Sequence, residues 1–282
     1  MIPAKFDYEV AESVEHAIEL LGSREEAKLL AGGHSLLPLM KLRLARPELL
    51  VDVGRLSDLS YVRDAGEQLA IGALTRHHDL ERDPLLQEHC PIVCYAAGLV
   101  GDPQVRHRGT IGGSVAHGDP ASDLPTVLLA LDAGLVARGP DGERTIAAAD
   151  FFTGFLETAL GPQEVLTEIR VPKLGTWKGW SYVKFNRRAQ DWATVGVAAI
   201  TRREDGKVED AAIGLTNMGA TPLRARAVEQ ALAGASVDDV ATAVEAADEG
   251  TSPPSDPNGS AEYRRHLARV LARRALEEAL SR

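Results

Sequence analysis

Cysteine is scarce in this chain of 282 residues, which contains only Cys90 and Cys94. Zinc sites and iron–sulfur clusters take further thiolate or imidazole ligands, and no other cysteine lies near this pair, so we interpret both as structural thiols. Long apolar runs are also missing. No stretch approaches the roughly 20 apolar residues that span a bilayer, and the N-terminus lacks the apolar core of a secretory signal. We therefore expect a cytoplasmic protein without a membrane span.

Basic residues are in the minority as well. The 31 Lys and Arg residues face 41 Asp and Glu residues, which gives a net charge of −10. This charge repels a phosphate backbone, and no basic stripe interleaved with aromatics offsets it, so nucleic acid is a poor partner. The remaining composition, 44% hydrophobic and 26% charged, is that of an ordinary globular protein. The length allows one large domain or two to three smaller ones.

Familiar site motifs are absent too. No G-x-G-x-x-G follows a strand-like run and no G-x-x-x-x-G-K-[ST] occurs, so neither a Rossmann dinucleotide site nor a P-loop is predicted. His77, His78 and Asp79 are adjacent, so their side chains project in different directions, and we expect surface or capping roles rather than a metal site. Asp119 and Asp123 lack an aromatic sugar platform, which argues against glycosidase carboxylates.

Apolar periodicity divides the chain into three parts. Residues 1–55 read as a small α/β unit with a helix after the capping Ser13, residues 56–172 as a second α/β subdomain, and residues 177–282 as a sheet followed by helices. The segment PKLGTWKGW connects the last two. Helices are expected at 14–21, at 92–99 and from Ser260 onward, and strands at 27–31, 49–53, 68–73, 134–137, 164–171, 180–185, 195–201 and 210–215.

The segment AGGHSLLPLMKLRLARPELLVDV carries the first glycine pair, Gly32 and Gly33. Two glycines between a strand and a short helix let backbone N–H groups converge on an anion such as a diphosphate, and Ser35 adds a hydroxyl donor. An ordinary tight turn uses the same residues, so this pair alone leaves both readings open.

The segment DPQVRHRGTIGGSVAHGDPASDLP, which spans 102–125, is the second glycine-rich stretch. We expect free backbone donors and hydroxyls from Gly109, Thr110, Gly112, Gly113 and Ser114. The carboxylates of Asp119 and Asp123 follow closely, and an ionised carboxylate is suited to accept hydrogen bonds from sugar or ribityl hydroxyls. The alternative for this stretch is a solvated loop between strands.

Together, these two segments resemble the FAD-binding segments of the molybdenum hydroxylase flavoproteins, a family that includes carbon monoxide dehydrogenase medium subunits and the FAD domain of xanthine dehydrogenases. LVDVGRL, EVLTEIRVP, QDWATVGVAA and SAEYRRHLARVLARRAL are similar in order and spacing. The resemblance implies an α+β fold of the vanillyl-alcohol-oxidase type, with two α/β subdomains and a C-terminal antiparallel sheet plus helices. It also implies FAD as cofactor, a large molybdopterin-binding partner and a small 2Fe–2S partner, with a dimer of heterotrimers as one assembly.

The resemblance also implies which residues hold FAD. Ala31 to Ser35 and Thr110 to Ser114 would clasp the diphosphate, Asp123 would bind the ribityl chain, and Lys184 would stabilise negative charge near the reduced ring. Two residues depart from the commoner pattern, His107 and Ser114, where asparagine is frequent. The full set of expected cofactor-binding residues is Ala31, Gly32, Gly33, His34, Ser35, Leu36, Thr110, Ile111, Gly112, Gly113, Ser114, His117, Asp123, Leu166, Lys184 and Trp192.

The function that follows is electron transfer within a complex. Electrons would pass from iron–sulfur clusters on a partner through FAD to an external acceptor, and the shortage of cysteine agrees with clusters on another chain. Two alternatives stay open, a stand-alone flavin oxidoreductase with His117 as its candidate base and a nucleotide-binding protein without redox chemistry. For Trp192, a place in the core is the alternative to a place beside the flavin. Substrate and electron acceptor are not encoded in these motifs.

Overall fold

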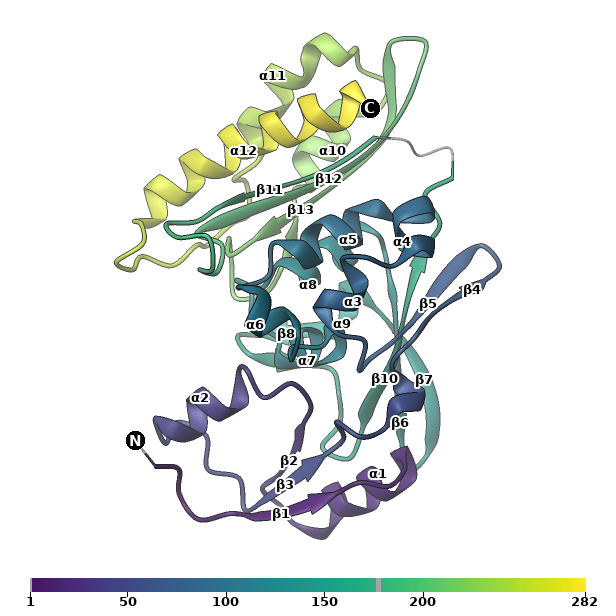
Figure 1. Cartoon of the computed structure of the whole chain (residues 1–282). Coiled ribbons are helices and arrows are strands. Elements are labelled where there is room, and N and C mark those ends of the chain that lie inside the picture. Colours follow the sequence, from purple (N-terminus) through teal and green to yellow (C-terminus); the bar gives the residue numbers. More distant parts are fainter. Residues whose placement is uncertain (1, 176–178) are drawn as a thin grey trace.

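The structure, a computed structural model, describes residues 2–175 and 179–282. Part of the connecting segment PKLGTWKGW and the expected boundary at residue 177 lie outside the described residues. The chain mixes helices and strands, as the sequence predicts, and is arranged in three tiers from the N-terminal to the C-terminal part (Figure 1). Each tier is built around its own sheet.

The N-terminal tier is a three-stranded parallel sheet in the order β1–β3–β2. Helix α1 (Val14–Ser23) covers it, and the Oγ of its N-cap residue Ser13 accepts a hydrogen bond from the backbone N–H of His16. Its apolar positions recur at helical spacing and are buried against the sheet. The strands are β1 (Asp7–Val10), β2 (Ala27–Leu30) and β3 (Leu49–Asp52).

The middle tier is a five-stranded antiparallel sheet in the order β4–β5–β10–β6–β7. Its helices α5 (Pro91–Gly98) and α8 (Asp123–Ala130) are buried along most of their length. The strands are β4 (Val62–Ala65), β5 (Gln68–Gly72), β6 (Gly134–Gly139), β7 (Gly142–Ala147) and β10 (Val165–Pro172), and β8 (Phe152–Gly154) pairs separately with β9 (Glu157–Thr158).

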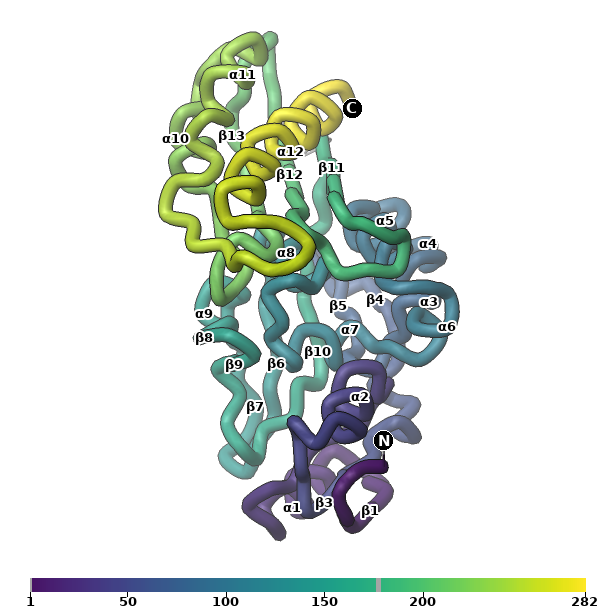
Figure 2. Tube along the Cα trace, turned by 90° about the vertical axis from the view of Figure 1, so that its left-hand side faces the viewer, coloured from purple at the N-terminus to yellow at the C-terminus, as the bar shows by residue number. Residues whose placement is uncertain are grey.

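The C-terminal tier is a four-stranded antiparallel sheet in the order β11–β12–β13–β14. One face packs on α5 and α8. The long helix α12 (Ala261–Ser281), with α10 (Arg226–Leu232) and α11 (Val240–Ala243), covers the other, as Figures 1 and 2 show. Side chains alternate between these faces, so Tyr182 belongs to the inner cluster and Val183 to the outer one. The strands are β11 (Gly179–Phe185), β12 (Val195–Glu204), β13 (Lys207–Thr216) and β14 (Leu223–Arg224).

The remaining helices of the described chain are short. None of its helices is both long and apolar enough to cross a bilayer. The α-helices not yet given are α2 (Leu36–Lys41), α3 (His77–Leu80), α4 (Pro84–His89), α6 (Pro103–Arg106), α7 (Ile111–His117) and α9 (Ala148–Phe151), and the 3-10 helices are η1 (Ser57–Leu59), η2 (Val237–Asp239) and η3 (Val244–Ala246).

The expected strands and helices are all present, with ends shifted by a few residues. Strands β1, β4, β7, β8, β9 and β14 were not expected. The residues of β1 and β4 are mostly exposed and carry charges, so they show little of the apolar alternation from which a strand is inferred. Their pairing with neighbouring strands, rather than their composition, makes them strands.

Candidate functional site

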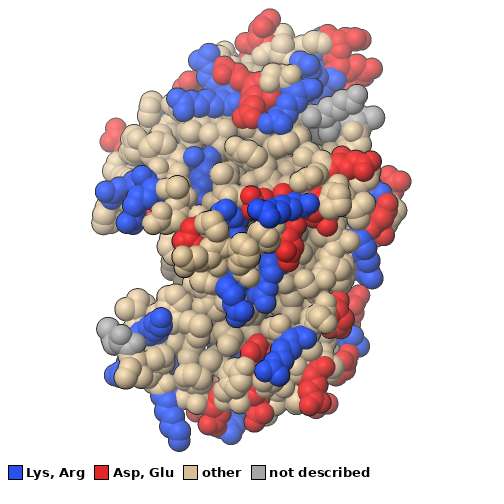
Figure 3. All heavy atoms as spheres, viewed as in Figure 1, with Lys and Arg blue, Asp and Glu red and all other residues tan. Residues whose placement is uncertain are grey.

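A cavity of about 810 Å³ lies where the three tiers meet. Residues of β2 and α2, of α7, and of the connection between β11 and β12 contribute to its walls. Figure 3 shows the molecule hollowed at the edge between α2 and that connection. The volume is in the upper part of the range for cofactor and ligand cavities. All of the expected cofactor-binding residues except Ile111 line it.

The first glycine segment enters the cavity between β2 and α2. Gly33 has φ +77°, a conformation that favours glycine, and its carbonyl accepts the N–H of Leu37 as α2 begins. Among the described residues, the N–H groups of Gly32, Gly33, His34 and Ser35 have no hydrogen-bond partner. The hydroxyl of Ser35 does not cap α2 either. The segment therefore offers consecutive unpaired donors, the arrangement that binds anions.

The backbone donors of the second glycine segment are mostly engaged, and the expectation of free donors is wrong for Gly109 and for Gly112 to Ser114. The N–H of Gly112 donates to the carbonyl of Ala73 at 2.8 Å, that of Gly113 to Oγ1 of Thr110 at 3.1 Å, and that of Ser114 to the Thr110 carbonyl at 3.0 Å. The N–H of Gly109 donates to the carbonyl of Val105. These bonds fix the start of α7, so ligand contacts from this segment fall to side-chain hydroxyls and to the glycine surface.

Close packing requires a glycine at position 112. A Cβ on Gly112 would lie 2.5 Å from the Cβ of Ala73, so no larger residue fits between α7 and the end of β5. Ile111 is fully buried in the core and does not line the cavity. Helix α7 ends at His117, and Gly118, with a φ of +66°, is its left-handed C-cap residue. This end places His117 at the cavity wall.

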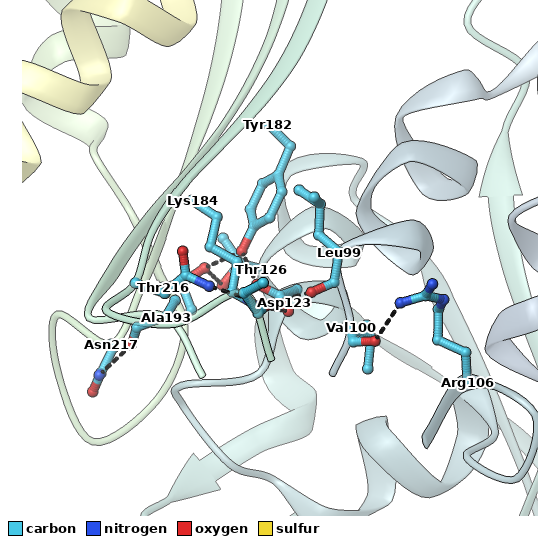
Figure 4. A network of polar contacts seen from close by, with 12 residues as sticks. Leu99, Val100, Arg106, Asp123, Thr126, Tyr182, Lys184, Ala193, Thr216 and Asn217 are labelled. Atoms are coloured by element: carbon cyan, nitrogen blue, oxygen red, sulfur yellow. Dashed lines mark hydrogen bonds and ion pairs between the residues drawn. The ribbon is translucent and has the colours of Figure 1, made fainter. Parts of the chain in front are cut away.

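A buried ion pair lies at the floor of the cavity (Figure 4). The Nζ of Lys184 donates to Oδ2 of Asp123 at 2.8 Å and to the carbonyl of Leu99 at 3.0 Å, and both charged side chains are about 95% buried. Burial raises the pKa of Asp123, while Lys184 and the hydroxyl of Tyr182 act to lower it. Since one oxygen of Asp123 accepts from Lys184 and the other from Tyr182, a ligand hydroxyl would share an oxygen that already accepts a bond.

Two further expected residues take contrasting positions on the wall. Leu166 is buried on β10, beside the irregularity in its pairing with β6. Trp192 is 64% exposed in the connection between β11 and β12, so its alternative interpretation as a core tryptophan is wrong. A large exposed aromatic at a cavity mouth is a surface on which a planar ligand can stack.

His77 is a cavity residue that sequence reasoning assigned elsewhere. It is 3% exposed, so a surface role is wrong, and its Nδ1 has no hydrogen-bond partner in the described chain. Burial, aided by Arg106 and Arg76, lowers its pKa to about 4, so the ring is neutral at pH 7. His78 instead stacks on His107 at 3.9 Å between ring centroids, and His107 is not a wall residue.

Other wall residues carried no sequence signal. The β8–β9 hairpin contributes Leu156, Glu157 and Thr158, and the turn before α6 contributes Gly101, whose φ is +52°. These segments lack a motif of their own, and only the packing of the tiers brings them to the cavity. The described residues contain no group of three or more His, Cys, Asp or Glu that could hold a metal ion, and both cysteines are buried thiols whose pKa burial raises to about 12.

These features fit the expected FAD. Unpaired backbone donors at Gly32 to Ser35 suit a diphosphate, and the exposed ring of Trp192 suits a planar ring system. Lys184 and Asp123 supply a charge pair in the wall of the same cavity. A Cβ on Gly32 or Gly33 would meet neighbouring atoms within 3 Å, so no side chain fits at either position. The backbone N–H groups are therefore not covered by side chains of these two residues.

Comparison with known proteins also indicates an FAD-binding protein, and the matches extend over almost the whole chain. Residues 4–174 match the family described as FAD binding domain in molybdopterin dehydrogenase, and residues 180–279 match the CO dehydrogenase flavoprotein C-terminal domain. The carbon monoxide dehydrogenase medium chain of Hydrogenophaga pseudoflava is 43% identical, and the alignment covers 100% of this chain and 99% of the relative. The glyceraldehyde dehydrogenase medium chain of Sulfolobus acidocaldarius is 38% identical, with 99% of both chains covered.

Solved structures agree. A chain of carbon monoxide dehydrogenase from Hydrogenophaga pseudoflava superposes with a TM-score of 0.97 at 45% identity, covering 100% of this chain and 99% of that one. A chain of quinoline 2-oxidoreductase from Pseudomonas putida 86 gives 0.95 at 32% identity, with the same coverage. The chain therefore belongs to the FAD-binding medium subunits of the molybdopterin-dependent dehydrogenases, a family of oxidoreductase subunits.

Proposed function

We propose that this chain is the FAD-carrying electron-transfer subunit of a molybdenum hydroxylase complex. It would link iron–sulfur clusters on a small 2Fe–2S partner to an external electron acceptor, while substrate is oxidised on a large molybdopterin-binding partner. The observation that carries the proposal is the cavity itself, in which unpaired backbone donors, a buried ion pair and an exposed aromatic line one space. The relatives are named as medium chains of dehydrogenases, which supports the multi-subunit assembly.

In this proposal the diphosphate is held chiefly by Gly32 to Ser35. Their N–H groups are unpaired, and the hydroxyl of Ser35 is available beside them. The hydroxyls of Thr110 and Ser114 would add to these contacts, since the N–H groups of Gly112 to Ser114 are engaged. Ala31, His34, Leu36, Gly112 and Gly113 line the same region of the cavity and would shape it.

The remaining wall residues would surround the ribityl chain and the ring. FAD, when bound, supplies the capacity to accept and release electrons. Asp123 would accept from ribityl hydroxyls, and Lys184 would favour negative charge on the reduced ring. Trp192 would cover one face of the ring, while Leu166 and His117 would close the wall and exclude water. The subdomain plan would be that of the vanillyl-alcohol-oxidase type.

The first test is reconstitution of the purified full chain with FAD. We expect the absorption spectrum of protein-bound oxidised flavin and one FAD per chain. A chain that stays colourless under all reconstitution conditions would contradict the proposal and would favour nucleotide binding without redox chemistry.

The second test separates a subunit from a stand-alone oxidoreductase. Co-expression with the neighbouring genes should yield a stable complex with a small iron–sulfur protein and a large molybdopterin protein. In that complex, reduction of the flavin should require the partners. If the FAD-loaded chain alone oxidises an organic reductant with turnover, the stand-alone function holds instead.

A further inference from the structure

Tyr182 lies directly behind the ion pair at the cavity floor. Tyr182 and Lys184 are two positions apart on β11, so both side chains point to the same face of the C-terminal sheet, toward α8. Figure 4 shows the two side chains converging on Asp123. Lys184 and Asp123 are wall residues, whereas Tyr182 is not and is 2% exposed. Tyr182 therefore reaches the site only through Asp123.

The hydroxyl of Tyr182 has a buried polar neighbour on each side. It donates to Oδ1 of Asp123 at 2.7 Å and lies 3.2 Å from Oγ1 of Thr216. Thr216 in turn donates to Oγ1 of Thr126 at 2.8 Å. Four hydroxyl and carboxyl side chains from α8, β11 and β13 thus form one buried network. A buried network of this kind holds its members in one geometry because each lost partner is costly.

Gly196 makes room for this arrangement. It pairs with Lys184 on one side and with Thr216 on the other, in the middle of the sheet. A Cβ at this position would lie 2.6 Å from the hydroxyl oxygen of Tyr182. The absence of a side chain on β12 therefore allows the phenol of β11 to cross to β13.

We propose, on the basis of the function proposed above, that Tyr182 is a positioning residue: its hydroxyl keeps the Asp123 carboxylate ionised against Lys184 and so lowers the positive charge that bound flavin meets. Burial and the nearby Asp119 raise the pKa of Asp123, and the tyrosine hydroxyl is one of the few groups that act against them. Without that donor the carboxyl takes up a proton more readily. Lys184 is then left without a compensating negative charge.

The test is the reduction potential of FAD bound to the full chain. Tyr182→Phe removes only the hydroxyl, and we expect the potential to become more positive because uncompensated Lys184 favours the more negative, reduced flavin. The potential reports the ratio of the affinities for reduced and oxidised flavin, so a merely looser fold, which weakens both equally, does not change it. We expect this ratio to rise about tenfold, the size of one charge-assisted hydrogen bond.

Tyr61→Phe is the matched control. The hydroxyl of Tyr61 donates to the Glu168 carboxylate at 2.6 Å, and neither residue lines the cavity, so this variant should keep the wild-type potential. In an Asp123→Asn background, Tyr182→Phe should cause no further shift, because the carboxylate through which it acts is gone. Should Tyr182→Phe not yield folded protein, Gly196→Ala disturbs the same hydroxyl and should shift the potential in the same direction.

The outcomes separate this inference from the function on which it rests. A wild-type chain that binds no FAD contradicts the proposed function. A chain that binds FAD, but whose Tyr182→Phe and Gly196→Ala variants keep the wild-type potential, overturns the positioning role alone. A shift of equal size with and without Asp123 overturns it too, because Tyr182 would then act on the flavin by another route.

Discussion

Gly32 and Arg108 hold the two glycine segments in direct contact. A Cβ built on Gly32 would lie 2.5 Å from the carbonyl oxygen of Arg108 and 2.8 Å from the Cα of Gly109. Residues 76 positions apart in sequence therefore meet backbone to backbone at the cavity wall. The glycine at position 32 is needed for this approach as well as for exposing its own N–H group.

Gly32→Ala should consequently separate the two segments. We expect a loss of about 1–3 kcal/mol in the free energy of unfolding, the usual result of overpacking, and an FAD affinity at least about tenfold weaker. Urea unfolding and FAD titration measure the two effects. Gly98→Ala is the control, since its Cβ would lie at an ordinary 3.4 Å from Cγ of Glu81. Equal behaviour of the two variants would show that the close approach is unimportant.

Removing only the cation of the buried ion pair should destabilise the chain much more than removing both charges. Lys184→Met leaves the Asp123 carboxylate buried without its cation, which should cost about 3–5 kcal/mol in the FAD-free chain. Asp123→Asn combined with Lys184→Met removes both charges and should recover most of that loss. Urea unfolding at pH 7 checks both variants. An unchanged stability for Lys184→Met would mean that the pair contributes nothing to the fold.

His77 predicts a pH-dependent stability. Its pKa is about 4 in the folded chain against an ordinary 6.5, so between these values the unfolded chain binds more protons. Stability is therefore fully present above pH 6.5 and is lost as the pH falls through about 4, by about 3 kcal/mol in all.

His77→Gln should flatten this part of the profile, measured by urea unfolding of the FAD-free chain at several pH values. His266→Gln, at an exposed position on α12, serves as the control and should retain the wild-type slope. A slope that persists in His77→Gln would assign the pH dependence to other groups.

Trp192 predicts a fluorescence signal for cofactor binding. Its ring is 64% exposed at the cavity, so bound FAD should cover and quench it. Trp192→Phe should lose most of the FAD-dependent quenching, which a titration monitored by tryptophan emission detects. Trp180→Phe should retain it, because Trp180 packs on Tyr95 away from the cavity. Quenching that is lost in Trp180→Phe instead would contradict the assignment.

Most of the cavity-lining residues that could be predicted lie in or near sequence motifs. The glycine segments and the residues read from the resemblance converge on one cavity, apart from Ile111. The failures occurred where a residue's partners are distant in sequence. For His77 a surface or capping role was expected because it lies in a run of adjacent residues without a ligand spacing, and its burial depends on elements distant in sequence. The N–H of Gly112 was expected to be free, but its acceptor, the Ala73 carbonyl, belongs to another segment.

The sequence by itself determined the class of protein, through the resemblance of its motifs to a known family. It also determined the main helices and strands and the two glycine segments that line the cavity, because periodicity and glycine placement are local properties of the chain. Only the tertiary structure decided which donors are unpaired, that Asp123 and Lys184 form a buried pair, and that Tyr182 stands behind them. Hydrogen-bond partners and burial depend on which tiers pack together. Asp123 lies on α8, Tyr182 and Lys184 on β11, and Thr216 on β13. No spacing in the sequence records the contacts of Asp123 with Lys184 and Tyr182, or of Tyr182 with Thr216.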